Sequence, residues 1–341
     1  MPYSSIGVPI FFVNHIEFLK ESDNSGYWAG QGQYDDLFNT LPVRPQALVY
    51  DLTYGAEGSK LDITLNNIPH LTENSFCAML GHDNGYSNNF FQIVDVGADG
   101  LVQDVVGYQN CYIYEDKVYS AFHGYSIALF NGLDVNNIII RLHNPDIASV
   151  VQNIGSIVIG TYYEMQAPNM SLTSSIEYDT VKEFTTHNGS SVSNTMGNQP
   201  MWGNLGAWEL SQHETDLSQH KLARSGRRVF TLKFSFMDQS DLWGSNQLFN
   251  TIAPELQADR YDLSDIAEDR SFAYNILTDQ NFFSMVYSKT MGNTIPFILK
   301  LNKDDLNHDN YCIARFRGNS LKATETAPGL YDISVIIEEA F

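Results

Sequence analysis

The residues best suited by type to metal binding are two histidines with acidic neighbours, His213-Glu214 and Asp216 with His220. On a helix, residues seven positions apart are separated by about 10 Å along the axis. That separation is too large for both imidazoles to bind one ion through adjacent turns. The spacing therefore favours a solvated polar segment, and we expect neither a metal ion nor a cofactor.

The sequence lacks the motifs of common catalytic centres. It contains no glycine-rich phosphate loop, no His-Glu-x-x-His, no Cys-x-x-Cys and no Gly-x-Ser-x-Gly. Its 40 acidic residues always supply carboxylate pairs for glycoside hydrolysis, but no pair stands out by an apolar setting. We expect Cys77, Cys111 and Cys312 to be reduced, small apolar residues, with Cys77 and Cys111 the one plausible disulfide pairing. The prediction is that the protein is not an enzyme.

Tyrosines are concentrated between residues 108 and 125. Tyr108, Tyr112 and Tyr114 begin this cluster. Tyrosine rings stack on sugars and carry a polar group to protein interfaces. Alternating tyrosines also pack at the edge of a β-sandwich, so both interpretations stay open. We treat these three residues as candidate contacts for a glycan or a protein.

The charge is strongly negative and unevenly spread. The chain has 19 basic and 40 acidic residues, a net charge of −21, which disfavours binding to nucleic acid and to anionic membranes. Residues 1–160 carry 5 basic and 17 acidic residues (net −12), whereas residues 221–341 carry 13 and 16 (net −3). This contrast indicates either two domains of different composition or a basic part that faces an acidic neighbour, such as another copy of the chain.

The composition is that of a globular, β-rich protein. Of the 341 residues, 13% are aromatic, and no apolar run reaches the roughly 18 residues that span a bilayer. The N-terminus lacks a basic stretch followed by an apolar one, so we expect no secretory signal.

Short strands at close spacing are predicted between residues 46 and 165. The candidates are residues 47–52, 61–65, 90–96, 118–121, 126–130, 137–142 and 154–163. Turn residues such as Asn66-Asn67 and Asn131-Gly132 separate them. This pattern is typical of a β-sandwich or jelly roll.

The rest of the chain also reads as mainly β. His187-Asn188-Gly189 between residues 180–186 and 190–195 predicts a hairpin. In residues 229–237, the apolar positions Phe230, Leu232, Phe234 and Phe236 alternate with polar residues and should share one buried face. A helix is expected after Asp279, with Lys289 near its end and Gly292 beyond it. Strands are expected at residues 295–301, 311–317 and 331–337.

These observations predict three parts. Residues 1–45 form an N-terminal segment that packs with the C-terminal domain, residues 46–165 a jelly-roll domain, and residues 166–341 a second β-rich domain with one or two short helices. The fold class is mainly β.

The C-terminal third resembles the distal-tail or minor-tail proteins of long-tailed bacteriophages. The resemblance is carried by Ser225-Gly226-Arg227-Arg228 before an alternating strand, then by Ile295-Pro296-Phe297-Ile298, Ala314-Arg315-Phe316 and Tyr331-Asp332-Ile333-Ser334. Residues 46–165 resemble, more weakly, a galactose-binding-like jelly roll, through residues 138–142 and 154–160.

The resemblance implies a structural virion protein that is assembled in the host bacterial cytoplasm. Residues 166–341 would then form a tail-ring domain, with copies closing into a ring, most simply six-fold, between the tail tube and the baseplate, hub or fibres. Arg224, Arg227 and Arg228 are expected to meet an acidic surface of the adjacent copy. The alternative function is a carbohydrate- or receptor-binding module on the virion surface that contacts a host glycan.

Overall fold

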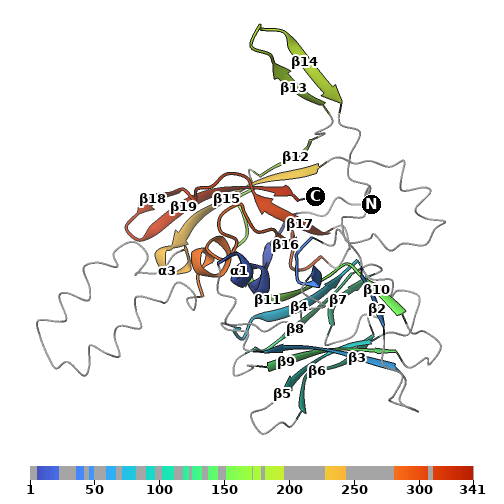
Figure 1. Cartoon of the computed structure of the whole chain (residues 1–341). Helices are drawn as coiled ribbons and strands as arrows, with labels where there is room; N and C mark the ends of the chain where they lie inside the picture. Colours follow the sequence, from blue (N-terminus) through green and yellow to red (C-terminus); the bar gives the residue numbers. More distant parts are fainter. Residues whose placement is uncertain are drawn as a thin grey trace, which may run out of the picture.

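The computed structural model describes sixteen segments of the chain: residues 6–22, 36–41, 46–49, 59–66, 71–81, 90–96, 102–110, 118–122, 125–132, 137–144, 151–170, 172–177, 181–195, 227–242, 280–305 and 310–340 (Figure 1). Their regular structure is almost entirely antiparallel β-strand, with short helical segments only. The predicted mainly β class is therefore confirmed.

One eleven-stranded antiparallel sheet runs through the molecule. In spatial order its path is β12 (Thr173–Glu177), β15 (Arg227–Asp238), β19 (Leu330–Glu339), β17 (Tyr311–Phe316), β16 (Phe297–Lys300), β1 (Ile10–Asn14), β11 (Ser156–Glu164), β4 (Ser75–Leu80), β8 (Tyr125–Phe130) and β7 (Val118–Phe122); β18 (Ala323–Ala327) pairs with β19 beside this path.

The N-terminal strand β1 joins the two halves of this sheet. It pairs with β11 on one side, where Phe12 lies opposite Tyr162, and with β16 on the other, where Phe12 lies opposite Ile298. Its five residues are all buried, which explains the apolar run at the start of the chain. Strands of the predicted middle and C-terminal parts are thereby hydrogen-bonded into one sheet.

A second sheet packs on part of the first and forms a β-sandwich. It has the order β3 (Ser59–Asn66), β9 (Asn137–Asn144), β5 (Phe90–Val96) and β6 (Val102–Asn110), and β2 (Gln46–Val49) pairs with β10 (Val151–Ile154) nearby. The sandwich core takes alternate residues from both sheets, including Leu61, Ile63, Leu65, Ile138, Ile140 and Leu142 from one and Cys77, Met79, Ala128, Ile157 and Ile159 from the other. On β3 the predicted alternation is confirmed, and Asp62 on its outer face pairs with Arg141 at 2.7 Å.

A second core lies on the opposite face of β11 and β4. Val158, Phe76 and Ala78 point into it, so this part of the large sheet is buried on both sides. It contains an aromatic cluster. The ring centroids of Phe11 and Phe282 are 5.6 Å apart, and those of Phe297 and Phe316 are 4.8 Å apart. Such contacts stabilise beyond their buried area.

Helical structure is short. Helix α1 (His15–Glu21) follows β1 directly, and the side chain of Asn14 caps it by accepting hydrogen bonds from the N–H groups of Ile16 (3.1 Å) and Glu17 (3.3 Å). Helix α3 (Gln239–Leu242) is a single turn after β15. The apolar spacing after residue 280 indicated a helix, and the structure has the π-helical turn η6 (Phe283–Tyr287) there. Asp279, the predicted cap, lies outside the described residues; Asn281 accepts the bond from the Ser284 N–H at 2.9 Å.

The predicted hairpin forms a separate two-stranded sheet. β13 (Val181–Thr185) pairs with β14 (Ser191–Thr195), with Asn188-Gly189 at the turn. Figure 1 shows this hairpin projecting from the body of the molecule at the end where β12 lies.

One predicted core residue is not buried. Phe230, Leu232 and Phe234 face the core as expected, but Phe236 is 68% exposed. The register between β15 and β19 shifts between Phe234 and Met237, which marks a β-bulge, and Phe236 has a φ of 58°. The extra residue of the bulge turns the Phe236 ring out of the alternating pattern.

Candidate assembly surface

Of the three arginines predicted at a subunit interface, Arg228 makes its contacts within its own chain. Its Nε lies 2.7 Å from Oε1 of Glu339, and its backbone N–H donates to Oε2 of the same carboxylate at 2.6 Å. Its Nη2 donates to the carbonyl of Tyr311 at 3.2 Å, and its guanidinium lies 5.8 Å from the Phe230 ring. The charge of Arg228 is thus compensated within the chain, by Glu339 beside the start of β15. These contacts do not test whether Arg228 also meets a second copy, and its interface role stays a prediction.

Arg227 and Arg224 are placed differently. Arg227 lies opposite Glu177 in the pairing of β12 with β15, and its charge contributes to lowering the pKa of that carboxyl. Arg224 lies outside the described residues. Arg227 is therefore one strand in from the edge strand β12, and its predicted role also stays a prediction.

A cluster of three charged residues that the sequence did not indicate holds the edge strand β12. Arg317 donates from Nη1 and Nη2 to the carboxylate of Glu177 (3.0 and 2.6 Å) and from Nε to Glu338 (2.6 Å). The hydrogen bonds between Arg317 and Glu177 are the main cause of the lowered pKa of Glu177, and together with the bond to Glu338 they raise the pKa of Arg317. The three residues come from three segments, so no local spacing in the sequence could have indicated the cluster.

Beyond this cluster, β12 is open to solvent. Its residues from Thr173 to Ile176 are exposed, and Ile176 keeps 57% of its surface accessible. The hairpin after it is equally open, since the side chains described from Thr185 to Val192 are all exposed. Edge strands with this exposure are templates for pairing with another chain.

The tyrosines of the other predicted contact fall where side chains are not described. The backbone of Tyr108 lies in β6, in the four-stranded sheet. Tyr112 and Tyr114 lie outside the described residues, as do His213, Asp216 and His220 of the segment considered for metal binding. Within the described segments, no group of three or more His, Cys, Asp or Glu residues could hold a metal ion.

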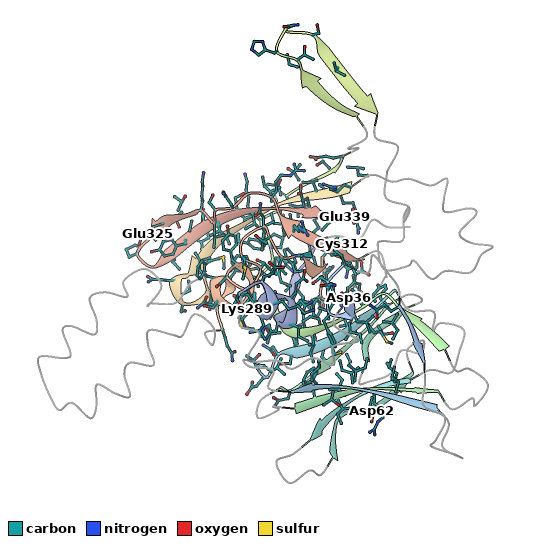
Figure 2. All side chains as sticks on the ribbon, viewed as in Figure 1. Asp36, Asp62, Lys289, Cys312, Glu325 and Glu339 are labelled. Atoms are coloured by element: carbon teal, nitrogen blue, oxygen red, sulfur yellow. The ribbon has the colours of Figure 1, made fainter. Side chains whose placement is uncertain are left out.

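The buried titratable groups of the described residues include two cysteines and a lysine. Cys77 and Cys312 are free and buried, as predicted, and burial raises the pKa of each thiol to about 12. Cys111 lies outside the described residues. Lys289, expected near the end of a helix, is only 1% exposed, and burial lowers its pKa to about 7 (Figure 2).

Comparisons with protein-family models, with curated proteins and with solved structures find no significant match to this chain. No helix among the described residues has the length and apolarity needed to cross a membrane. Three exposed features stand out among the described residues: the edge strand β12, the projecting β13–β14 hairpin and the ring of Phe236.

Proposed function

We propose that this chain is a structural protein of the tail tip of a long-tailed bacteriophage, and that its copies close into a ring between the tail tube and the baseplate or fibres. The proposal rests on the resemblance of residues 221–341 to distal-tail or minor-tail proteins. It also rests on the exposed edge strand β12 and the projecting β13–β14 hairpin. Six-fold symmetry is the expected ring order. The neighbours in the virion are tail-tube and baseplate or hub proteins.

The projecting β13–β14 hairpin is the observation that carries the assembly role. A two-stranded hairpin by itself is at best marginally stable in water. Here it forms its own sheet, and Val192 at its exposed end keeps 51% of its surface accessible. A partner surface that covers the hairpin supplies the missing burial, so the element suits a subunit that contacts its neighbours.

The charge of the hairpin supports the same role. Residues 181–195 contain one lysine, Lys182, and one glutamate, Glu183, in a chain of net charge −21. Copies of so acidic a chain repel one another over most of their surface. A neutral element can approach a second copy without that repulsion, which favours contact at the hairpin.

The mass of the full-length protein in solution tests the proposal. Light scattering over a dilution series should give a discrete closed oligomer, and negative-stain images of the same sample should show rings. A monomer at every concentration with no rings would overturn the ring proposal. If that monomer also bound a host-surface glycan in an array, the carbohydrate-binding alternative would replace it.

A further inference from the structure

The projecting β13–β14 hairpin ends in a turn that contains the pair Asn188-Gly189. The N–H of Gly189 donates to the carbonyl of Thr186 at 2.9 Å, and the N–H of Thr186 donates to the carbonyl of Ser190 at 2.8 Å. Gly189 has a φ of 78°, so a glycine in the left-handed region closes the turn, a common form of hairpin connection. The turn lies at the end of the hairpin that points away from the body of the molecule (Figure 1).

An asparagine followed by glycine undergoes a reaction that needs no enzyme. The backbone nitrogen of the glycine attacks the side-chain carbon Cγ of the asparagine, which forms a C–N bond and closes a succinimide ring. The bond from Cγ to Nδ2 breaks, and the side-chain nitrogen leaves as ammonia with the proton of the attacking N–H. Water then opens the ring at either carbonyl and gives aspartate or isoaspartate. Glycine favours the attack because it has no Cβ beside the nitrogen and the widest backbone freedom.

The surroundings of Asn188 leave this reaction open. The side chains described from residue 185 to residue 192 are all exposed, and a Cβ placed on Gly189 would have no atom within 4 Å. The hydrogen bond of the Gly189 N–H must break before its nitrogen attacks. Its acceptor, the carbonyl of Thr186, belongs to the same exposed turn of a two-stranded hairpin, which is at best marginally stable in water. Opening of the turn therefore costs little free energy.

A second pair of the same type, Asn131-Gly132, is held in the opposite way. Gly132 is buried, and its N–H donates to the carbonyl of Thr72 at 2.8 Å. The hydroxyl of Ser75 donates to the same carbonyl at 2.7 Å, and a Cβ placed on Gly132 would lie 2.5 Å from that hydroxyl oxygen. The nitrogen of Gly132 therefore reaches the side chain of Asn131 only if this packing is disrupted. The third pair, Asn84-Gly85, lies outside the described residues.

We propose that Asn188 is a site of spontaneous deamidation, and that the fold directs the reaction to this pair rather than to Asn131. The product carries a new carboxylate at the end of the hairpin. Residues 181–195 contain one lysine and one glutamate, so the reaction changes the net charge of the hairpin from zero to −1. The hairpin is thus neutral in the newly made chain and becomes acidic as the chain ages.

Peptide mapping by mass spectrometry tests the assignment on the full-length chain. In the folded protein at neutral pH, Asn188 should convert about tenfold or more faster than Asn131, because the turn opens more readily than the packed body. In urea, where the fold protects neither pair, the two rates should converge. Asn188→Gln is the matched variant: its side chain would have to close a larger ring, so conversion at this position should stop while conversion at Asn131 is unchanged.

Two results would overturn the inference. One is an equal rate at Asn188 and Asn131 in the folded chain, which would mean that the fold does not select the site. The other is an Asn188 that converts only in urea, which would mean that the hydrogen bond from Gly189 to Thr186 protects the turn.

The new charge also bears on self-association, and this step rests on the proposed function of the hairpin as a contact between copies. A carboxylate at the end of the hairpin repels the acidic chain that it approaches. Asn188→Asp reproduces the charge and should weaken self-association about twofold to fivefold in sedimentation velocity, whereas Asn188→Gln should associate like the unmodified chain. Equal association of the two variants would refute the effect on assembly while the mapping result decides the deamidation. An unmodified chain that forms no rings would refute the proposed function instead.

Discussion

Lys289 places an amine in an apolar core. It is 1% exposed, and its Nζ donates to the sulfur of Met285 at 3.9 Å. Thioether sulfur is a weak acceptor, so the ammonium form loses its hydration with little in return. Desolvation therefore lowers the pKa of Lys289 from 10.5 to about 7.

The substitution Lys289→Met should stabilise the protein at neutral pH. Between pH 7 and 10.5 the folded chain binds fewer protons at this site than the unfolded chain, so its stability rises with pH across that window. At pH 7 and below, the full cost of the buried amine is present, on the order of a few kcal/mol. Urea unfolding at pH 7 should give the variant a clearly higher free energy of unfolding than the unmodified chain. This difference should be smaller at pH 9.

Lys322→Met is the matched control, because Lys322 is exposed and its substitution removes the same charge without removing a buried amine. Its stability should stay within about 0.5 kcal/mol of the unmodified chain at both pH values. If the difference in free energy of unfolding between Lys289→Met and the unmodified chain did not change with pH, this would contradict the neutralisation of the amine in the folded state.

For single residues, the sequence predicted burial correctly where the residue belonged to a regular apolar alternation. Phe230, Leu232 and Phe234 are buried as their alternation predicted. The prediction that Phe236 is buried was wrong, because the alternation ends at the bulge. The two adjacent apolar residues Phe236 and Met237 were the sequence signal of that break. The burial of Lys289 had no signal in the sequence, because lysine is seldom buried.

At the scale of elements, strong patterns gave nearly correct strands. β5 occupies the predicted residues 90–96, and the β13–β14 hairpin was found from its Asn-Gly turn. β4 was missed because it is buried on both faces and shows no alternation, and β12 because its polar residues carry no apolar period. Both depend on distant partners, which no local sequence pattern records.

The pairing of β1 with β11 depends on Gly160. A Cβ at this position would lie 1.9 Å from the carbonyl oxygen of Val13 and 2.9 Å from the N–H nitrogen of His15, both backbone atoms. Gly160→Ala should therefore push the two strands apart and destabilise the protein by on the order of 3 kcal/mol. A lowered urea midpoint, measured against the unmodified chain, checks this.

Ser156→Ala, on the same strand, is the matched control for Gly160→Ala. The Ser156 hydroxyl is buried with no hydrogen-bond partner among the described residues, so its removal should be neutral or slightly stabilising. Equal unfolding midpoints for the two variants would refute the close approach of β1 at Gly160.

The edge strand β12 is held by the Arg317 cluster, and Arg317→Ala should loosen it. Amide hydrogen exchange in β12 and the facing part of β15 should accelerate, with little change in the sandwich sheet. The lowered pKa of Glu177 sets a pH dependence: its stabilisation is present above pH 4.5 and is lost as the pH falls through the folded-state pKa. The protection of β12 amides, after correction for the slower intrinsic exchange at low pH, should therefore fall on acidification in the unmodified chain but not further in Arg317→Ala.

Lys322→Ala serves as the control for Arg317→Ala, since it also removes an exposed cation. Exchange in β12 should stay unchanged in this control. If Arg317→Ala protects β12 as well as the unmodified chain does, strand pairing alone holds the edge and the ion pairs are incidental.

At the scale of the whole molecule, one sheet serves two cores. β11 and β4 supply alternate side chains to the sandwich core and to the aromatic core, so the two parts meet through shared strands. The sequence indicated the sandwich and the second β-rich part separately. It could not indicate their junction, because the pairing of β1 with β16 joins residues almost 300 positions apart in the chain.

The net charge of −21 governs how copies approach one another. The Debye length is about 30 Å at 0.01 M salt and about 8 Å at 0.15 M. At low salt the whole charge of each copy repels the other, whereas at 0.15 M only charges close to the contact matter. Self-association should therefore strengthen as salt rises across this range.

Sedimentation velocity at a fixed protein concentration measures this effect. The fraction of assembled protein should increase between 0.01 and 0.15 M sodium chloride, and potassium chloride at matched ionic strength should give the same curve, because screening does not depend on the identity of the cation. Association that weakens steadily over this range would contradict this expectation, because it would mean that attraction at the contact outweighs the repulsion between whole copies.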